Sequence, residues 1–265
     1  YMIKSGGSIL FAPPGAGKSY TALLLAISMD SGTSVLWPCT KAVTLFVNLE
    51  RSPASIQRRI GSINVALGLE PDRPLLVQNA RGKSLSDIRD IVAKSIDKYS
   101  VEVVVLDSIS RAGLGDLNEN KPVNSIIDTL NGLCDTWLAL AHTPRADTSH
   151  VYGGIHFEAG ADMMIQMVSV SQPTSLGIGL RIVKANDTSK PPLAAYTYTF
   201  DSDGLTAVRR AKVSEYPALT AGIEMPLADE ILHYLLNEAG QASASQIAEE
   251  LKKSRSYIVR TLHAD

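Results

Sequence analysis

The sequence predicts an α/β protein with a mainly parallel central sheet, antiparallel strands at one edge of that sheet, and a small all-α tail. Three observations support this prediction. Apolar runs alternate with helical patterns over the first half of the chain, strand patterns then follow one another from Met163, and helical patterns return at Leu227. We therefore expect one domain over residues 1–213, a linker over residues 214–226, and a tail over residues 227–265 that is itself truncated.

The strands expected in the first half are short apolar runs bounded by turn residues. They cover residues 8–11, 43–49, 75–78, 101–106 and 137–141. Helical spacing predicts helices over residues 18–29, 56–69, 86–99 and 124–134, the third opened by Ser84 or Ser86. Because strands and helices alternate, we expect βαβ units with parallel strands. The run VEVVVL, residues 101–106, suits a central strand covered on both faces.

The second half predicts an antiparallel sheet edge and then a helical tail. Successive strands are expected over residues 163–170, 176–183 and 194–200, with few helix signals between them. The tail has the pattern of three helices, over residues 227–237, 243–251 and from 254 onward, with a stop at Gly240 and N-caps at Ser243 and Ser254. A short helix, a tight turn and a third helix are typical of helix-turn-helix and winged-helix domains.

Composition narrows the class of protein. Of the 265 residues 45% are hydrophobic and 20% charged, and no stretch approaches the roughly 18 apolar residues that a membrane span needs, so no membrane contact is expected. Cys39 and Cys134 lack C-x-x-C spacing and neighbouring histidines, which argues against a disulfide framework or a zinc site and favours the cytoplasm. A net charge of −2 means that any DNA contact must be local. No signal peptide is visible, and the opening at Tyr1 suggests a fragment.

The segment APPGAGKS, residues 12–19, predicts a loop that binds the phosphates of ATP. Its glycines let successive amides point at an anion ahead of a helix N-terminus. Lys18 is expected to reach the β- and γ-phosphates and the Ser19 hydroxyl to ligate Mg²⁺. The motif usually has glycine at the position of Ala12. Alanine is acceptable there when this position has ordinary backbone at the end of a strand and needs no positive φ. The residues expected to bind the nucleotide are Pro14, Gly15, Ala16, Gly17, Lys18, Ser19 and Tyr20.

Two acidic residues complete the predicted site. Asp107 ends the strand VEVVVLD, whose carboxyl end faces the nucleotide crevice, and is the expected second metal residue. Because Ser108 follows it, the base that aims the attacking water must come from elsewhere, and Glu50 at the end of VTLFVNLE is the candidate. If that strand lies beside the phosphate-loop strand, the Glu50 carboxylate is expected near the γ-phosphate. The alternative is a solvated charge at a strand end.

These motifs, followed by a strand with a polar tip, WLALAHT, resemble the RecA-like ATPases, a group that includes DnaB-type and RepA-type replicative helicases, RadA and KaiC. The resemblance covers about residues 5–201 and weakens after residue 179. It implies a RecA-like P-loop sandwich, hydrolysis of Mg²⁺-ATP, and a homo-oligomeric ring, expected to be a hexamer. It also implies that His142 senses the γ-phosphate, although a histidine that only caps a buried strand is the alternative.

The resemblance further implies a basic residue that acts in the neighbouring subunit's site. In LRIVKANDTSK, Lys184 matches the lysine of the family's late-strand element, whereas Asn186 or Asp187 stands where an arginine is expected. Arg181 is the possible substitute. Both Lys184 and Arg181 can equally be exposed strand charges.

Single-stranded DNA is the expected partner. By the same resemblance, loops 110–124 and 144–156 face the channel of the ring, and both are rich in Gly, Asn and Pro. Ordinary surface loops are the alternative, since Asp147 offsets Arg145. In the tail, acidic residues also allow a domain that binds only protein. The candidate DNA contacts are Arg111, Lys121, Arg145, His150 and His156 in the loops, and Arg255, Tyr257 and Arg260 in the tail.

The functional hypothesis favoured by the sequence is a RepA-type helicase that translocates on single-stranded DNA. A RadA-like recombination ATPase is the first alternative, although the chain lacks the four-cysteine module that usually precedes a RadA core. A KaiC-like regulatory ATPase without unwinding activity is the second. A small-molecule kinase is least favoured, because no arginine-rich lid is visible.

Overall fold

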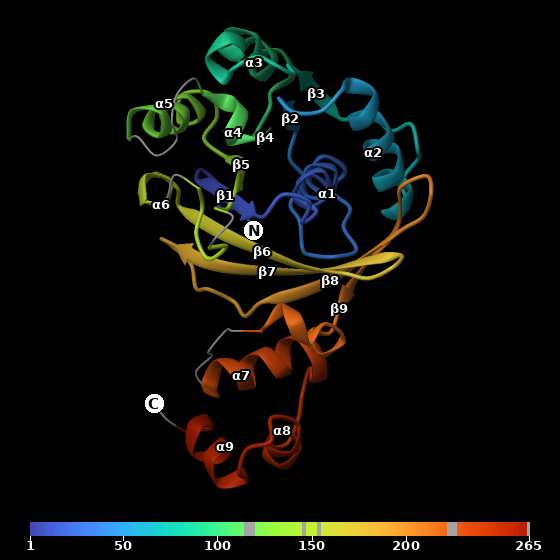
Figure 1. Ribbon diagram of the computed structural model, residues 1–265, viewed down its shortest axis with the longest axis vertical. Coiled ribbons are helices and arrows are strands. Elements are labelled where there is room, and N and C mark those ends of the chain that lie inside the picture. The colour runs from blue at the N-terminus through green and yellow to red at the C-terminus, as the bar shows by residue number, and fades with distance from the viewer. Residues whose placement is uncertain (114–119, 145–146, 153–154, 222–226, 264–265) are drawn as a thin grey trace.

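The computed structural model describes residues 1–113, 120–144, 147–152, 155–221 and 227–263. Within these residues nine strands form one sheet in the order β3-β2-β4-β5-β1-β6-β7-β8-β9 (Figure 1). The strands are β1 (Gly7–Ala12), β2 (Thr44–Asn48), β3 (Leu76–Asn79), β4 (Val103–Asp107), β5 (Trp137–His142), β6 (Met163–Ser171), β7 (Ser175–Ala185), β8 (Ala194–Phe200) and β9 (Leu205–Ala211). From β3 to β6 neighbours pair in parallel, and from β6 to β9 they pair antiparallel, so the predicted mixed sheet is confirmed.

Helices cover both faces of the parallel part. They are α1 (Lys18–Ser31), α2 (Pro53–Ala66), α3 (Leu85–Tyr99), α4 (Ile109–Ala112), α5 (Asn120–Asn131) and α6 (Ile155–Gly160). α1 and α2 enclose one hydrophobic core, and α3 to α6 enclose a second. Val103 and Val105 of β4 face the first core, whereas Val104 and Leu106 face the second. Burial on both faces explains why this strand is an almost continuous β-branched run.

Two predictions about the sheet were wrong. β2 ends at Asn48, so Glu50 lies in the bend beyond the strand. β2 pairs with β3 and β4, and both β4 and β5 separate it from β1, so the strand of Glu50 is not beside the phosphate-loop strand. In addition, β9 was not predicted. Its sequence, LTAVRRA, buries every third residue, so it lacks the alternating pattern that marks a half-buried strand.

The loops predicted after β4 and β5 are partly helical. Lys121 lies in the first turn of α5, which begins four residues earlier than predicted, and His156 lies in α6 rather than in a loop. α5 buries Val123 and Ile126 in the second core, and α6 buries Phe157 there. These apolar contacts stabilise α5 and α6, where the Gly, Asn and Pro content had suggested loops.

The tail contains three helices, α7 (Leu227–Tyr234), α8 (Ala244–Glu250) and α9 (Arg255–Leu262), with a π-helical turn over Leu235–Ala239. Ser243 and Ser254 are N-caps whose side chains accept from the amides of Gln246 and Tyr257, as predicted. Ile231, Ile247, Ala248 and Ile258 form a small core of their own. Short 3₁₀ turns, Val213–Glu215 and Pro217–Leu219, precede the tail, which lies beyond β7 to β9 (Figure 1). A DNA-binding role for these helices remains a prediction.

Candidate functional site

The predicted phosphate loop joins β1 to α1 and has the backbone that such a loop requires. β1 ends at Ala12, α1 begins at Lys18, and Gly15 and Gly17 have φ values of 81° and 99°. Because a positive φ strains any residue with a Cβ, glycine is needed at both positions. Ala12 pairs as an ordinary strand residue with His142 of β5, which explains why alanine is accepted there. The N-terminus of α1 thus lies at the carboxyl edge of the sheet, where its free amides favour an anion.

Lys18 folds back over its own loop. Its ammonium donates to the carbonyls of Ala12 at 2.7 Å and Pro13 at 2.8 Å, and lies 3.2 Å from Nδ1 of His142. Burial of the side chain lowers the pKa of Lys18 to about 8, although two nearby carboxylates oppose the shift. The carbonyls hold the ammonium where phosphate oxygens of a bound nucleotide would compete for it.

Asp107 ends β4 and faces the same edge. The residue is 2% exposed, and its Oδ2 has no hydrogen-bond partner within the described residues. Burial raises the pKa of Asp107, and a hydrogen bond from the Ser19 hydroxyl opposes that shift. An orphaned carboxylate oxygen beside a hydroxyl fits Mg²⁺, which binds one or two protein oxygens together with substrate phosphates. In the described parts of the chain no three or more His, Cys, Asp or Glu side chains are grouped so that they could hold a metal ion.

Glu50 reaches this cluster from the bend after β2. The Ser108 hydroxyl donates to its Oε1, and Oγ of Ser110 lies 3.4 Å from the same oxygen. Nε2 of His142 lies 3.8 Å from the same oxygen. The proximity of His142 and the Ser108 hydrogen bond hold the pKa of Glu50 at about 2, with burial opposing them, so Glu50 is ionised at neutral pH.

His142, the predicted sensor, therefore lies between Lys18 and Glu50. It is the last residue of β5, and its two ring nitrogens face the ammonium and the carboxylate respectively. The structure thus brings together Lys18, Glu50 and His142, with the hydrogen-bonded pair of Ser19 and Asp107 close enough for electrostatic coupling to Lys18 and Glu50. Their individual roles remain predictions.

Two arginines of this region were missed from the sequence. Burial raises the pKa of Asp107, and the charges of Arg51 and Arg59 are among the effects that oppose it. The guanidinium of Arg59 lies 4.3 Å from the ring centroid of Tyr20, a residue predicted to bind the nucleotide. Nε of Arg51 is buried and has no hydrogen-bond partner in the described chain. The position of Arg51 directly after Glu50 was an available signal, whereas nothing local indicated which way Arg59 faces.

Lys184 and Arg181 of β7 both donate hydrogen bonds within their own chain. Lys184 donates to the carbonyls of Glu158 and, at 2.7 Å, of Ala161. Arg181 donates to Oε1 of Gln166 at 2.6 Å. The register through β6 places Arg181 nearer than Lys184 to the carboxyl end of β1. Action in a neighbouring subunit remains a prediction for both residues.

The candidate DNA contacts fall into two separate regions. One group lies in the segments that follow β4 and β5 in the chain and comprises Arg111, Lys121, His150 and His156. Nδ1 of His150 lies 3.2 Å from Asp147, so an acidic neighbour offsets that candidate. The position predicted for Arg145 lies outside the described residues. The other group is on α9, which Figure 1 shows on the far side of β7 to β9 from α4 and α5.

The α9 group comprises Arg255, Tyr257 and Arg260. Nε of Arg255 donates to Oγ of Ser245 at 3.2 Å, and the guanidinium of Arg260 lies 5.2 Å from the centroid of the Tyr257 ring. Tyr257 is 42% exposed, so its ring remains accessible to a ligand. Because the two groups lie in different parts of the molecule, one strand of DNA would not meet both within a single compact surface.

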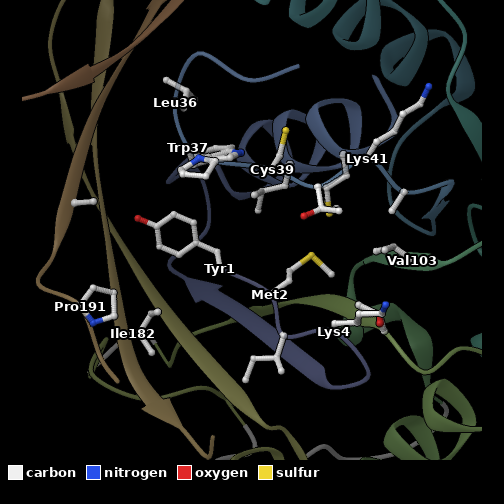
Figure 2. Close-up of a pocket in the computed structure, with 18 of the residues that line it drawn as sticks. Tyr1, Met2, Lys4, Leu36, Trp37, Cys39, Lys41, Val103, Ile182 and Pro191 are labelled. Carbon is white, nitrogen blue, oxygen red and sulfur yellow. The ribbon is translucent and has the colours of Figure 1, made fainter. Parts of the chain in front are cut away.

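A cavity of about 600 Å³ opens at the other end of the sheet. Its lining includes Lys4, Val103 and Thr136, which lie at or just before the amino ends of β1, β4 and β5, whereas the phosphate loop follows the carboxyl end of β1. Figure 2 shows Tyr1, Met2, Trp37 and Cys39 around the space, and the Tyr1 and Trp37 rings pack edge to face at 5.9 Å. Many of the residues that line this cavity are apolar, whereas the phosphate loop lies at the opposite edge of the sheet.

Comparison with known proteins agrees with this geometry. The sequence matches the AAA domain family over residues 1–145, more than half of the chain. The crystal structure of a KaiC-like protein from the hyperthermophilic archaeon Pyrococcus horikoshii OT3 has a TM-score of 0.56 and 15% sequence identity, and the match covers 78% of this chain and 90% of that chain. This likeness shows the fold. No curated protein matches the sequence significantly. The described residues contain no helix long and apolar enough to cross a bilayer. The chain therefore belongs to the AAA domain family and has the fold of a RecA-like P-loop ATPase.

Proposed function

We propose that the protein hydrolyses Mg²⁺-ATP with Glu50 as general base, and that it works as a ring-forming motor on single-stranded DNA, most like a RepA-type replicative helicase. The observation that supports the hydrolytic part best is the chain of contacts from Lys18 through His142 to Glu50, beside Ser19 and Asp107. A cation for the phosphates, a hydroxyl and carboxylate for the metal, and an ionised base converge on one edge of the sheet.

In the proposed reaction the phosphate loop orients the triphosphate and Lys18 neutralises its β- and γ-phosphates. Water attacks the γ-phosphorus, its proton passes to the Glu50 carboxylate, and the bond to the bridging oxygen of ADP breaks. Bound Mg²⁺ would stabilise the charge that develops on the phosphates. His142, which now lies between Lys18 and Glu50, would report the presence of the γ-phosphate to the segment that follows β5.

The motor part of the proposal depends on assembly. Lys184 or Arg181 would stabilise transition-state charge in the neighbouring subunit of a homo-oligomeric ring, expected to be a hexamer. Because both side chains are bound within their own subunit, either would have to exchange those contacts for phosphate oxygens. A catalytic difference between isolated and assembled subunits is therefore expected.

Single-stranded DNA is proposed as the partner because residues with donor side chains, including Arg111 and His150, follow the two strands that also supply Asp107 and His142. A KaiC-like regulatory ATPase is the second candidate, favoured by the structural likeness to a KaiC-like protein and by the low charge of the segment after β5. A RadA-like recombination ATPase would use the same site and the same partner.

The decisive experiment is ATP turnover with and without single-stranded DNA, in the wild type and in Glu50→Gln. We expect DNA to raise wild-type turnover several-fold, and Glu50→Gln to abolish turnover while a fluorescent ATP analogue still binds. Unchanged turnover on adding DNA would favour the regulatory candidate. Normal turnover in Glu50→Gln would refute the assignment of the base.

A further inference from the structure

We infer that Asn48 is a positioning residue for Glu50: its side-chain amide clamps the backbone that follows Glu50 and so fixes the direction in which this carboxylate enters the phosphate site. The inference rests on the proposed function, because it concerns the efficiency of the proposed base. Asn48 does not touch the reacting atoms. It acts on the reaction only by fixing the bend after β2, in which Glu50 lies.

The geometry of the clamp is specific. Oδ1 of Asn48 accepts from the Arg51 amide at 2.9 Å, and Nδ2 donates to the Arg51 carbonyl at 2.8 Å. The second Nδ2 hydrogen is used by Oδ1 of Asn79, at 2.9 Å, on the neighbouring strand β3. Asn48 is 0% exposed, so its own end of each of these bonds is buried. Both amide donors of the side chain are therefore committed to one arrangement.

Glu50 is fixed on its other side as well. The amide of Leu49 donates to the carbonyl of Asp107 at 2.8 Å, which ties the residue before Glu50 to the end of β4. The Asn48 backbone is in register with both Asp107 and Asn79, and its carbonyl accepts from Ala80 at 2.9 Å. Glu50 therefore lies between one residue tied to β4 and one residue clamped by Asn48.

Asparagine suits this position because its side chain carries an acceptor and a donor side by side. Aspartate would keep the acceptor for the Arg51 amide but would replace Nδ2 with an oxygen that faces two other acceptors, the Arg51 carbonyl and the Asn79 oxygen. Alanine would leave the Arg51 amide and carbonyl without these partners. Loss of the clamp would allow the bend after β2 to move. The Glu50 carboxylate would then spend less time in the position from which it orients the attacking water. A misplacement of 1 Å can cost about 100-fold in rate.

The matched control is Asn64 on α2. It is also 0% exposed, and its Nδ2 also has two acceptors, which here are both backbone carbonyls, those of Pro71 and Arg73 in the loop that follows α2. Asn48→Ala removes three hydrogen bonds of a buried side chain and Asn64→Ala removes two, but only Asn48 lies next to Glu50 in the structure. If Asn48 matters only for stability, the two variants should behave alike.

The experiment measures kcat, KM for ATP and the binding of a fluorescent ATP analogue in both variants, at a temperature where circular dichroism shows both folded. We expect kcat of Asn48→Ala to fall about 10- to 100-fold with KM and analogue affinity unchanged, because Lys18 and Ser19 lie on a different connection. We expect Asn64→Ala to keep the wild-type kcat. Equal effects of the two variants, or a normal kcat in Asn48→Ala, would overturn the inference.

Two further variants keep the inference open to refutation. If Asn48→Ala does not fold, Asn79→Ala removes one bond of the clamp at an exposed residue, and we expect a several-fold lower kcat with unchanged KM. In a Glu50→Gln background, Asn48→Ala should cause no additional loss of residual turnover. If Glu50→Gln itself keeps wild-type turnover, the proposed base fails, and the inference falls with it. If Glu50→Gln is inactive while Asn48→Ala and Asn79→Ala are normal, only the positioning role fails.

Discussion

Nucleotide binding should draw a proton onto Lys18 at alkaline pH. Burial lowers the pKa of Lys18 to about 8 from its usual 10.5 in the nucleotide-free protein. A bound triphosphate supplies opposite charge and should return the pKa to at least 10.5. At about pH 9 the Lys18 amine is then about one-tenth protonated in the nucleotide-free protein and almost fully protonated in the nucleotide-bound protein. Binding therefore takes up about 0.9 proton. At about pH 7 the same arithmetic gives an uptake of about 0.1 proton.

The sign of the effect follows from the lowered pKa. Between pH 8 and 10.5 the unfolded chain binds more protons at Lys18 than the nucleotide-free native state does, so the contribution of Lys18 to stability rises with pH across that window. ATP should cancel this rise, because the bound state keeps the proton. Calorimetric titration of ATP in two buffers of different ionisation enthalpy measures the uptake directly. Equal apparent enthalpies in the two buffers at pH 9 would refute the reasoning, since they would mean that binding takes up no proton.

Three further substitutions test the site and its scaffold. Gly17→Ala places a Cβ at φ 99° and 2.9 Å from Leu176, so it should cost about 1–2 kcal/mol in a thermal melt and weaken ATP binding; full affinity would contradict the phosphate-loop geometry. Asp107→Asn removes a carboxylate whose pKa is raised by burial, so the melting temperature should hold or rise while Mg²⁺-dependent binding of ATP falls; a lower melting temperature with normal Mg²⁺ dependence would argue against a metal role. Gly7→Ala puts a Cβ 2.1 Å from the Trp137 ring, and urea unfolding should show a loss of about 1–3 kcal/mol or more; an unchanged midpoint would mean that this contact relaxes freely.

The sequence predicted best those parts of the site that depend on residues close together in the chain. The turn through Gly15 and Gly17, the helix that starts at Lys18, and Asp107 at the end of a buried strand all depend on local residue types. The same holds for the caps Ser243 and Ser254, since each bonds an amide three residues ahead.

The parts that the sequence did not predict depend on which strands become neighbours. Nothing within residues 43–50 indicates that β4 and β5 insert between β2 and β1, because the order of strands is set by the crossover connections. The clamp by Asn48 depends on the turn geometry around Arg51 and on β3 supplying Asn79. The stacking of Arg59 on Tyr20 depends on how α2 packs beside α1.

The predicted strand order was wrong, but Glu50 still lies in the site, and the reason is structural. Parallel strands end at one common edge, so side chains that follow β1, β5, β4 and β2 converge there whatever their order in the sheet. The two intervening strands supply the links: His142 at the end of β5 contacts Lys18, and Ser108 after β4 donates to Glu50. His142 also lies 3.8 Å from Glu50, so it couples the cation of the phosphate loop to the proposed base. A γ-phosphate that competes for His142 and Lys18 would therefore remove one of the contacts that keep the pKa of Glu50 at about 2, and the base would strengthen only when its substrate is present.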